Sequence, residues 1–426
     1  MNLIDRDKKL IWHPFTRQQI EISDIIAISR AKNSYIFDEN GKKYLDLISS
    51  WWVNLHGHAN PRIAKAIYNQ ARSLEHIIFA GFTHEPAVKL CENLKTILPQ
   101  NYTKFFFSDN GSTTIEVALK LAYQYWHNRG EKKRSIFLSF EGGYHGDTFG
   151  AMSVGNKSGF HDVFDDLFFK VISLPYPHTY LNDAQIEEKE NIAFKFLDDI
   201  LSESGEQIAA IILEPLIQGA SGMRFARSSF IEKVINKVRA YDILVIFDEV
   251  MTGFGRLGTN FAFEQTNIEP DFLCISKGIT GGFLPLALTV TSEKIYSEFI
   301  SKEWNKAFMH GHSYTANPIA CAAANESLNI LTSPACQSSI KDINIVHQNF
   351  AQNTNSPFIK NIRFLGTICA FEVYNITKSI KQIKDDLLKE GLIIRPLGNS
   401  FYILPPYCTT RYQLENAYKK LLKVIK

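Results

Sequence analysis

The chain has 426 residues, and its 46 basic and 44 acidic side chains give a formal net charge of +2 at neutral pH. This balance gives no reason to expect nucleic acid or an acidic membrane surface as a partner. The length is sufficient for one large α/β domain and a second, smaller one. Aromatic residues make up 12% of the chain, which indicates a large packed core.

The six cysteines are scattered, without a C-x-x-C pair or the spacing of metal ligands. This pattern predicts reduced thiols in a cytoplasmic protein and no metal site. The first sixteen residues contain no apolar core of a signal peptide, so we expect none. No apolar run approaches the roughly 20 residues of a membrane-spanning helix.

The N-terminal region predicts a β-hairpin followed by a pair of tryptophans. Strand-like runs at Tyr35–Asp38 and Lys43–Leu47 flank the turn sequence D-E-N-G. Trp51 and Trp52 come next. Neighbouring side chains on a strand face opposite ways, so we expect one tryptophan to pack in the core and the other to line a cavity.

Between residues 61 and 331, apolar runs alternate with helical patterns, which predicts a mostly parallel sheet covered by helices on both faces. The expected helices are Pro61–Leu74, Glu85–Leu98, Thr113–Asn128, Phe230–Ala240 and Asn317–Leu331. The expected strands are Lys104–Ser108, Ser135–Phe140, Ile208–Leu213, Ile243–Phe247, Phe272–Ile275 and Leu286–Thr291.

The texture of the sequence changes near residue 332. A polar helical region is followed by short strands on both sides of a helix. The expected helix is Lys381–Gly391, and the expected strands are Ile362–Leu365, Ile368–Val373, Leu392–Arg395 and Phe401–Leu404. We therefore expect a small α+β domain, residues 332–426, which the N-terminal segment 1–60 joins. Residues 61–331 form the expected large domain.

Two of the predicted parallel strands end in residues that carry chemistry. One ends in Asp248-Glu249 and the other in Ser276-Lys277-Gly278. Ligands of open α/β sheets bind outside the carboxyl ends of the strands. A lysine held near an acid suits Schiff-base chemistry, and pyridoxal phosphate (PLP) needs such a lysine, an Asp for its ring nitrogen and a phosphate cradle. The alternative is that both residues merely cap strands at the surface.

Three other stretches carry candidate ligand contacts. A strand, the turn Gly111-Ser112 and a helix form the layout of an anion site, although Ser112 also suits a plain helix cap. Hydroxyls before the helix at 317, such as Ser313, allow the same two interpretations. Glycines flank Tyr144 and His145, which indicates a tight loop holding a ring against a flat group. Arg395 at a strand end is either a surface charge or a carboxylate clamp.

One stretch matches G-x-G-x-x-G, the glycine pattern of dinucleotide-binding loops: Gly253-Phe254-Gly255-Arg256-Leu257-Gly258. That function requires a helix to open on the glycines. The residues that follow lack helical periodicity, so the match does not favour a dinucleotide site.

The run D-E-V-x-T-G-F-G-R from Asp248, followed by P-D and S-K-G around Lys277, resembles the class III PLP-dependent aminotransferases. Further matches lie at W-H-P (Trp12), S-S-W-W (Ser49), G-Y-H-G-D-T-F-G-A-M-S (Gly143), M-H-G (Met309), N-P (Asn317) and I-R-P (Ile394). The resemblance spans about residue 11 to Pro406. It implies an α/β chain of PLP-dependent transferase fold type I, with a large, mostly parallel sheet domain and a small α+β domain.

The resemblance also implies roles for individual residues. The catalytic residues would be Lys277 as the Schiff-base lysine, Asp248 as the partner of the ring nitrogen, and Tyr144 beside the ring. The cofactor contacts would be Gly111, Ser112, Tyr144, Asp248, Lys277, His312 and Ser313, with Ser313 reaching the phosphate of the other subunit of a homodimer. The substrate contacts would be Phe15, Trp51, Tyr144, Lys277, Gly311 and Arg395.

Within the family, the motifs are most similar to enzymes that use S-adenosyl-L-methionine to aminate 8-amino-7-oxononanoate in biotin synthesis. The family often has Tyr where Phe15 stands, and some enzymes of this step take the amino group from lysine instead, so the donor stays open. Ser313 stands where the family has Thr and can still donate to phosphate. The rival hypotheses are a class III enzyme for ornithine, 4-aminobutyrate or a diamine, and a non-catalytic binding protein of the same fold.

Overall fold

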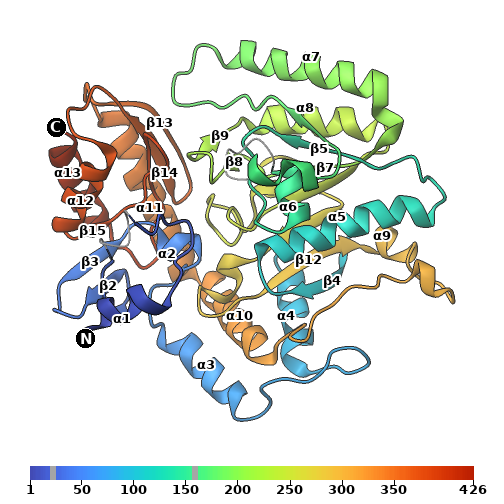
Figure 1. Ribbon diagram of the computed structural model, residues 1–426, viewed down its shortest axis with the longest axis horizontal. Coiled ribbons are helices and arrows are strands. Elements are labelled where there is room, and N and C mark those ends of the chain that lie inside the picture. Colours follow the sequence, from blue (N-terminus) through green and yellow to red (C-terminus); the bar gives the residue numbers. More distant parts are fainter. Residues whose placement is uncertain (20–24, 156–161) are drawn as a thin grey trace.

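The computed structural model describes residues 1–19, 25–155 and 162–426, and its largest element is a seven-stranded sheet (Figure 1). Strand β12 runs antiparallel to both of its neighbours, and the other strands share one direction. The strand order is β4 (Tyr102–Ser108), β12 (Ala287–Ser292), β11 (Phe272–Ile275), β10 (Leu244–Asp248), β7 (Ile208–Leu213), β5 (Ile136–Phe140) and β6 (Val171–Leu174).

Each face of this sheet is covered by helices because its strands are apolar on both sides. Leu244 and Ile246 pack in one core cluster with residues of α5 (Gly111–Asn128). Val245 and Phe247 pack in the other, which contains residues of α7 (Ile186–Ser204) and α8 (Ser228–Arg239). This alternation with a period of two is the pattern expected of a parallel strand buried on both faces.

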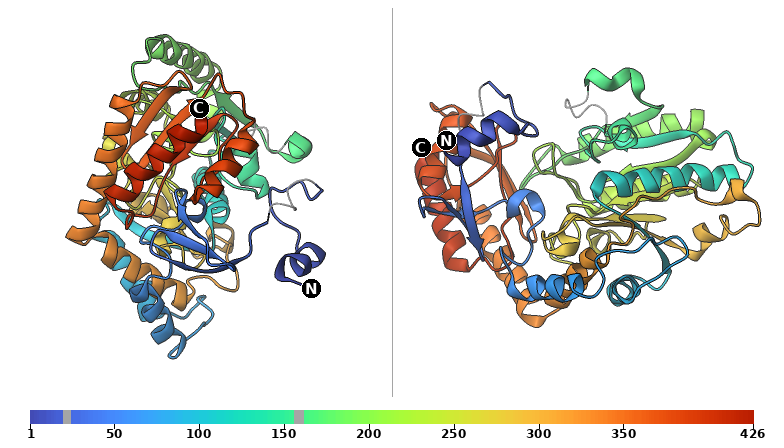
Figure 2. Two further views of the ribbon diagram at one scale, coloured as in Figure 1. Left: turned by 90° about the vertical axis from the view of Figure 1, so that its left-hand side faces the viewer. Right: turned by 60° about the horizontal axis from the view of Figure 1, so that its bottom comes forward.

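Two smaller sheets lie beside the large one, and the first of them joins strands from the two ends of the chain (Figure 2). The first contains β1 (Ile28–Lys32), β2 (Tyr35–Asp38), β3 (Lys43–Asp46) and β15 (Leu392–Ile393); the second contains β13 (Ile359–Leu365), β14 (Ile368–Val373) and β16 (Ser400–Ile403). In the first, Leu45 of β3 lies opposite Leu392 of β15 in a parallel pair. The N-terminal hairpin is therefore completed by a strand from the C-terminal region.

The remaining helices connect these sheets. They are α1 (Leu3–Leu10), α3 (Pro61–Ala71), α4 (Glu85–Lys95), α6 (Phe149–Val154), α9 (Glu293–Ser297), α10 (Pro318–Leu331), α11 (Pro334–Asn353), α12 (Ile380–Lys389) and α13 (Arg411–Ile425). Asn60 and Asn317 cap α3 and α10, and each cap is followed directly by proline. Within the described residues, no helix is long and apolar enough to cross a bilayer.

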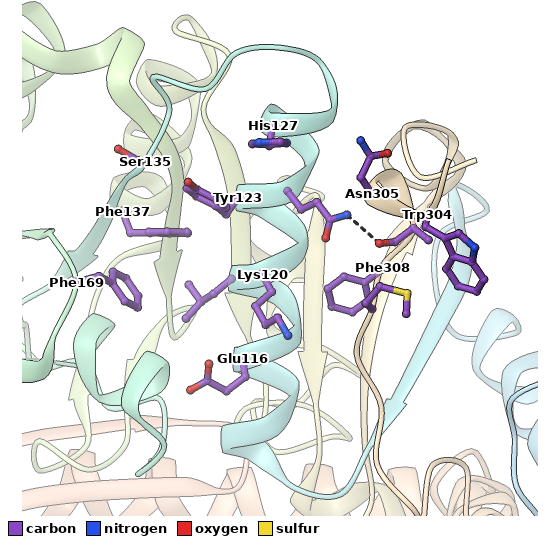
Figure 3. Close-up of a pocket in the computed structure, with 14 residues that line it drawn as sticks. Glu116, Lys120, Tyr123, His127, Ser135, Phe137, Phe169, Trp304, Asn305 and Phe308 are labelled. Carbon is purple, nitrogen blue, oxygen red and sulfur yellow. Dashed lines mark hydrogen bonds between the residues drawn. The ribbon is translucent and has the colours of Figure 1, made fainter. Parts of the chain in front are cut away.

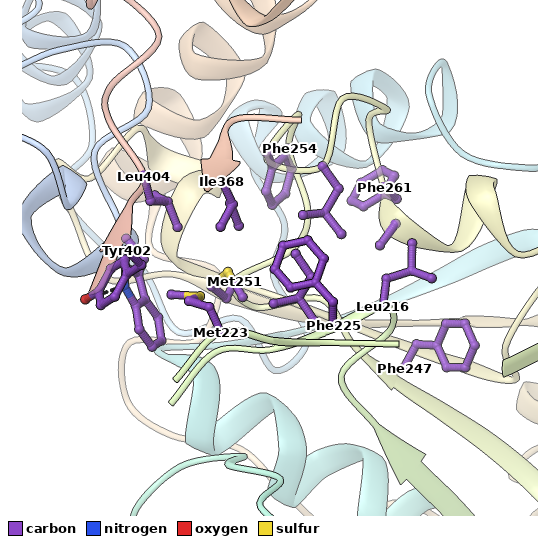
Figure 4. Packing of buried hydrophobic residues seen from close by; sticks show 14 of the residues in the cluster. Leu216, Met223, Phe225, Phe247, Met251, Phe254, Phe261, Ile368, Tyr402 and Leu404 are labelled. Carbon is purple, nitrogen blue, oxygen red and sulfur yellow. Dashed lines mark hydrogen bonds between the residues drawn. The ribbon is translucent and has the colours of Figure 1, made fainter. Parts of the chain in front are cut away.

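A continuous apolar cluster joins the C-terminal region to the large sheet (Figure 4). Ile368, Tyr402 and Leu404 lie on one side of it, and Met251 and Phe254 on the other. All five residues are at most 4% exposed. Burying a side chain of this size stabilises the fold by roughly 1.5–3 kcal/mol, so this contact holds the two regions firmly together.

The expected α/β class and mostly parallel sheet are confirmed. Strands β2, β7, β11 and β14 begin and end at the predicted residues, and the other predicted strands deviate by a few residues at their ends. The expectation for Gly253–Gly258 is also correct, because these residues form consecutive turns and no helix opens on them. The sequence patterns did not indicate α1, β1 or α13.

Candidate active site

Three carboxyl-terminal strand ends meet at one edge of the large sheet, because β7, β10 and β11 are parallel neighbours. Asp248 ends β10, Lys277 follows β11 after one residue, and Glu214 follows β7 directly. The parallel register therefore brings a lysine and two carboxyl groups to one place. This is the edge at which the strand-end rule predicts a ligand.

Asp248 is buried and held from two sides. Its Oδ2 lies 2.7 Å from Nδ1 of His145, and its Oδ1 accepts a hydrogen bond of 3.0 Å from the backbone N–H of Val250. The side chains of His145 and Asp248 are 1% and 6% exposed. A carboxylate fixed in this way suits a fixed partner, such as the protonated nitrogen of an aromatic ring.

Lys277 is only partly buried and lines a cavity of about 400 Å³. Its backbone has a positive φ of 44°, a left-handed conformation that L-residues rarely adopt. Its Nζ lies 4.5 Å from the centre of the Trp52 ring. Burial lowers the pKa of Lys277, although the negative charges of Asp248 and Glu214 oppose this shift. A lowered pKa favours the neutral amine, which is the form that attacks a carbonyl carbon.

Glu214 ties the loop around Tyr144 to the sheet edge. Its carboxyl oxygens accept hydrogen bonds from the backbone N–H groups of Tyr144, at 3.1 Å, and Gly219, at 2.8 Å. Burial raises the pKa of Glu214 to about 7, and the charge of Asp248 adds to this while His145 opposes it. Glu214 therefore fixes the backbone from which the Tyr144 ring projects.

The start of helix α5 forms a compact turn that suits a phosphate group. A side chain added at Gly111 would place its Cβ 2.8 Å from Val250, and one added at Gly146 would place its Cβ 2.0 Å from the Ser112 hydroxyl oxygen. Both glycines are therefore required by close packing. The Ser112 hydroxyl accepts a hydrogen bond from the Asp147 backbone N–H, at 3.1 Å. Unpaired first-turn N–H groups and the positive helix end attract anions.

The outer wall of the cavity contains side chains from distant parts of the chain. Phe15, Trp51, Tyr144, Lys277 and Arg395 all line it. The Arg395 guanidinium lies 3.8 Å from the centre of the Trp51 ring, and the edge of the Phe15 ring meets the same indole at 5.6 Å between centroids. Burial lowers the pKa of Arg395. An arginine stacked in this way can present its planar donor fork to a carboxylate.

Trp51 and Trp52 sit on a left-handed turn, Ser49–Trp52, labelled α2 in Figure 1. The φ angles of its four residues are 49°, 46°, 71° and 75°. Left-handed helical backbone costs L-residues roughly 1–2 kcal/mol each. Trp51 is 38% exposed and lines the cavity as expected, whereas Trp52 is 5% exposed and lines the cavity as well, so the expected division between a packed ring and a cavity ring is only partly correct. The predicted alternation along a strand was the wrong reason, because this segment is not a strand.

The structure does not bring Gly311, His312 and Ser313 into the Lys277 cavity of the same chain. Gly311 and Ser313 are exposed, and the Ser313 carbonyl accepts a hydrogen bond from His76. His312 Nδ1 lies 3.4 Å from Asp109 Oδ2, just before the turn at Gly111. These residues therefore lie beside the phosphate turn but on the outer surface of the chain.

The donor set fits PLP in each of its three requirements. Lys277 supplies an amine for the aldehyde, Asp248 supplies a buried carboxylate for the ring nitrogen, and the start of α5 at Gly111 and Ser112 supplies N–H groups for the phosphate. Sequence reasoning missed His145 as the partner of Asp248, because the contact depends on a loop conformation. It also missed Glu214, although the strand-end rule could have found this residue after β7.

A family model described as "Aminotransferase class-III" matches residues 17–425. Adenosylmethionine-8-amino-7-oxononanoate aminotransferase of Synechococcus elongatus is 46% identical, and the alignment covers 97% of this chain and 98% of the relative. The structure of the enzyme of that name from Methanocaldococcus jannaschii superposes with a TM-score of 0.91 at 34% identity, covering 99% and 98% of the two chains.

An amine transaminase from an uncultivated Pseudomonas species, solved in its PLP-bound form, has a TM-score of 0.88 at 29% identity. The match covers 97% of this chain and 98% of that one. The fold, the sheet edge that carries Lys277 and Asp248, and these full-length matches agree. The chain belongs to the class III aminotransferases, which use pyridoxal phosphate as their cofactor.

Proposed function

We propose that this enzyme transfers an amino group from S-adenosyl-L-methionine to 8-amino-7-oxononanoate, which gives 7,8-diaminononanoate for biotin synthesis. The observation that carries the proposal is one cavity that contains both Lys277, an amine for the cofactor, and Arg395, a fork for a substrate carboxylate. The Synechococcus elongatus relative, 46% identical over nearly the whole chain, carries the name of this activity.

Lys277 acts first as the attachment point and then as the base. Bound PLP supplies an aldehyde that accepts an amine and a ring that withdraws electrons from the adjacent carbon. Lys277 would hold the cofactor, and its neutral Nζ, which faces the cavity, would take the proton from the donor carbon when it is not bound to the cofactor. The lowered pKa of Lys277 favours this unprotonated form.

Asp248 and His145 hold the proton on the ring nitrogen. The Asp248 carboxylate provides the negative charge, and His145 fixes its orientation through the 2.7 Å contact. Tyr144, whose backbone N–H is bound by Glu214, supplies an aromatic wall beside the ring. Burial raises the pKa of the Tyr144 hydroxyl, and a hydrogen bond with Asp147 adds to the shift, so this hydroxyl stays protonated and can donate.

Phe15, Trp51 and Arg395 form the substrate side. Arg395 binds the carboxylate of the ketone, and the broad faces of Trp51 and Phe15 accept its apolar chain. The same faces accommodate two dissimilar substrates in turn, because apolar contact is not directional. Phe15 has no hydroxyl for the donor, so lysine is the alternative donor to test.

We further propose a homodimer in which the Gly311–Ser313 loop of one chain completes the phosphate site of the other. Next to this loop lies a cavity of about 620 Å³ along α5, lined on one side of the helix by residues such as Trp304 and Phe308 and on the other by Phe137 and Phe169 (Figure 3). Figure 3 shows Phe137, Phe169 and Phe308 around it, and Trp304 at its rim is 78% exposed. A second copy of the chain would cover this apolar surface.

We also propose the division of the chain into residues 1–60 with 332–426 and a large domain of residues 61–331. The parallel pair of β3 and β15 supports the grouping of the two ends of the chain. Limited proteolysis that leaves a stable fragment of residues 61–331 would support these boundaries.

The test of the proposed function is a panel of donors and acceptors with purified, PLP-loaded protein. We expect 7,8-diaminononanoate by mass spectrometry with 8-amino-7-oxononanoate as the acceptor and adenosylmethionine as the donor. Product formed with lysine but not with adenosylmethionine as the donor would confirm the proposed acceptor and show that lysine is the donor. No product with either, together with turnover of ornithine or 4-aminobutyrate, would contradict the proposal.

A further inference from the structure

A fully buried carboxylate, Asp46, lies at the base of the left-handed turn Ser49–Trp52. It is the last residue of β3 and has 0% exposure. Its Oδ1 accepts a hydrogen bond from the Ile48 backbone N–H at 3.1 Å. Its Oδ2 accepts from the backbone N–H of Ser50 at 2.8 Å and from the Ser50 hydroxyl at 3.1 Å. Asp46 thus binds the polar groups that the unusual backbone turns inward.

A second group of residues orients Asp46. Nε2 of His58 lies 2.9 Å from Oδ2 of Asp46, and the Asn54 amide nitrogen lies 3.2 Å from Nδ1 of His58. The amide is a donor, so Nδ1 accepts and Nε2 carries the proton that it donates to Asp46. The carboxylate therefore has donors on both oxygens and its orientation is fixed.

The turn controls where two rings of the cavity lie. Trp51 stacks beneath the Arg395 guanidinium at 3.8 Å. Trp52 donates from Nε1 to the Tyr402 hydroxyl at 3.1 Å, and its ring lies below Lys277. Trp52 thus has its own side-chain anchor. No hydrogen bond is present at the Trp51 indole within the described residues, so its place depends on the backbone that Asp46 holds and on its ring contacts.

We propose that Asp46 is a positioning residue for substrate recognition: it stabilises the left-handed turn and thereby sets Trp51 beneath Arg395, the carboxylate clamp. This proposal rests on the proposed function, because it takes Arg395 as the group that binds the ketone. It predicts that damage to Asp46 weakens ketone binding while the cofactor side keeps its properties.

The first test is Asp46→Asn in the PLP-loaded enzyme, because Asn keeps the shape but replaces one acceptor oxygen with a donor. We expect KM for 8-amino-7-oxononanoate to rise roughly tenfold or more, since a buried partner is left unpaired. We expect kcat to change by less than about threefold. The absorbance of the lysine-bound cofactor should stay the same, and the near-UV circular dichroism of the tryptophans should change even without substrate.

The matched control is Asp38→Asn. Asp38 is also a buried carboxylate of the N-terminal sheet, and it accepts hydrogen bonds from the backbone N–H groups of Asn40 and Lys42 and from the Tyr44 hydroxyl. It does not line the Lys277 cavity. We expect this variant to lose stability to a similar extent but to keep the KM of the unmodified enzyme.

A rescue experiment separates positioning from folding. Asp46→Ala removes all the acceptors, and Ser50→Gly added to it places glycine at a φ of 46°, where glycine pays no Cβ penalty. We expect the double variant to recover part of the KM and part of the circular dichroism signal lost in Asp46→Ala.

Each outcome decides the proposal. An unchanged KM and an unchanged tryptophan signal in Asp46→Asn would overturn it. So would unfolding of both Asp46 variants without rescue by Ser50→Gly, because Asp46 would then serve folding alone. If the unmodified enzyme does not turn over 8-amino-7-oxononanoate, the proposed function fails, but the tryptophan signal of Asp46→Asn and Asp38→Asn still tests the turn.

Discussion

The two sides of the Lys277 cavity are built in different ways. On the cofactor side, Asp248, His145 and Glu214 are 4–6% exposed and are held by contacts at the edge of one sheet. On the substrate side, Trp51 is 38% and Phe15 is 52% exposed. These two side chains come from the N-terminal segment, and their neighbour Arg395 comes from the C-terminal region.

This difference separates chemistry from recognition. Charged groups that act on the cofactor need a fixed, water-poor frame, where their interactions are strong. Groups that meet two substrates in turn need accessible surfaces and less confinement. We therefore expect substitutions on the cofactor side to lower kcat and those on the substrate side to raise KM.

The largest effect is expected for Lys277→Ala. Without the amine, neither attachment of the cofactor nor proton transfer can occur, so turnover and the absorbance of the lysine-bound cofactor should both disappear. The matched control is Lys237→Ala, which removes a lysine that pairs with Asp198 on the surface of α8. Retained turnover in Lys277→Ala would remove this residue from the catalytic role.

A smaller but still large effect is expected for Asp248→Asn. The neutral amide cannot hold a proton on the ring nitrogen, so kcat should fall by roughly a hundredfold or more, with thermal stability nearly unchanged. His145→Gln should give an intermediate loss, because the charge remains but its orientation is less fixed. Near-normal kcat in Asp248→Asn would show that the ring does not depend on this carboxylate.

Arg395→Ala should act mainly on the ketone. Loss of a charged hydrogen-bonding fork costs roughly 1.5–3 kcal/mol, which corresponds to an increase in KM of about 10- to 150-fold. The donor KM should change far less. Arg395→Lys keeps the charge without the planar fork, so its KM for the ketone should lie between those of the unmodified enzyme and Arg395→Ala. Equal increases for both substrates would contradict the role of Arg395 as a clamp for the ketone.

Glu214→Gln should change how stability depends on pH in the cofactor-free protein. Burial raises the folded-state pKa of Glu214 from 4.5 to about 7. The folded state then binds the proton of Glu214 more tightly than the unfolded state does. The stabilisation that this gives is complete below about pH 4.5 and is lost as the pH rises through about 7. We expect the loss to be on the order of 3 kcal/mol.

Urea unfolding of the native and Glu214→Gln proteins at pH 5 and pH 8 measures this contribution. The difference in unfolding free energy between the two proteins should shrink with pH by that amount. A difference that stays constant would mean that Glu214 is ionised throughout this range.

The cofactor side could be predicted from the sequence because it follows strand ends. Apolar runs place β10 and β11, and the residues that terminate them, Asp248 and Lys277, must lie at one edge of the sheet. The substrate side could not be derived in this way. The left-handed turn at Trp51 violates the backbone preferences that sequence patterns rely on, and its partners, Asp46 and Arg395, lie on other elements. The strand-end position of Arg395 left both a surface charge and a carboxylate clamp open, and Phe15 was predicted only through family resemblance.

The most direct test of this account is a half-reaction followed by absorbance. Adenosylmethionine alone is added to the PLP-loaded enzyme, and 8-amino-7-oxononanoate is added afterwards. We predict that the band of the lysine-bound cofactor disappears with the donor and returns with the ketone. Bleaching by lysine but not by adenosylmethionine would reassign the donor. A band that responds to neither amine, yet bleaches with ornithine or 4-aminobutyrate, would contradict the proposed reaction.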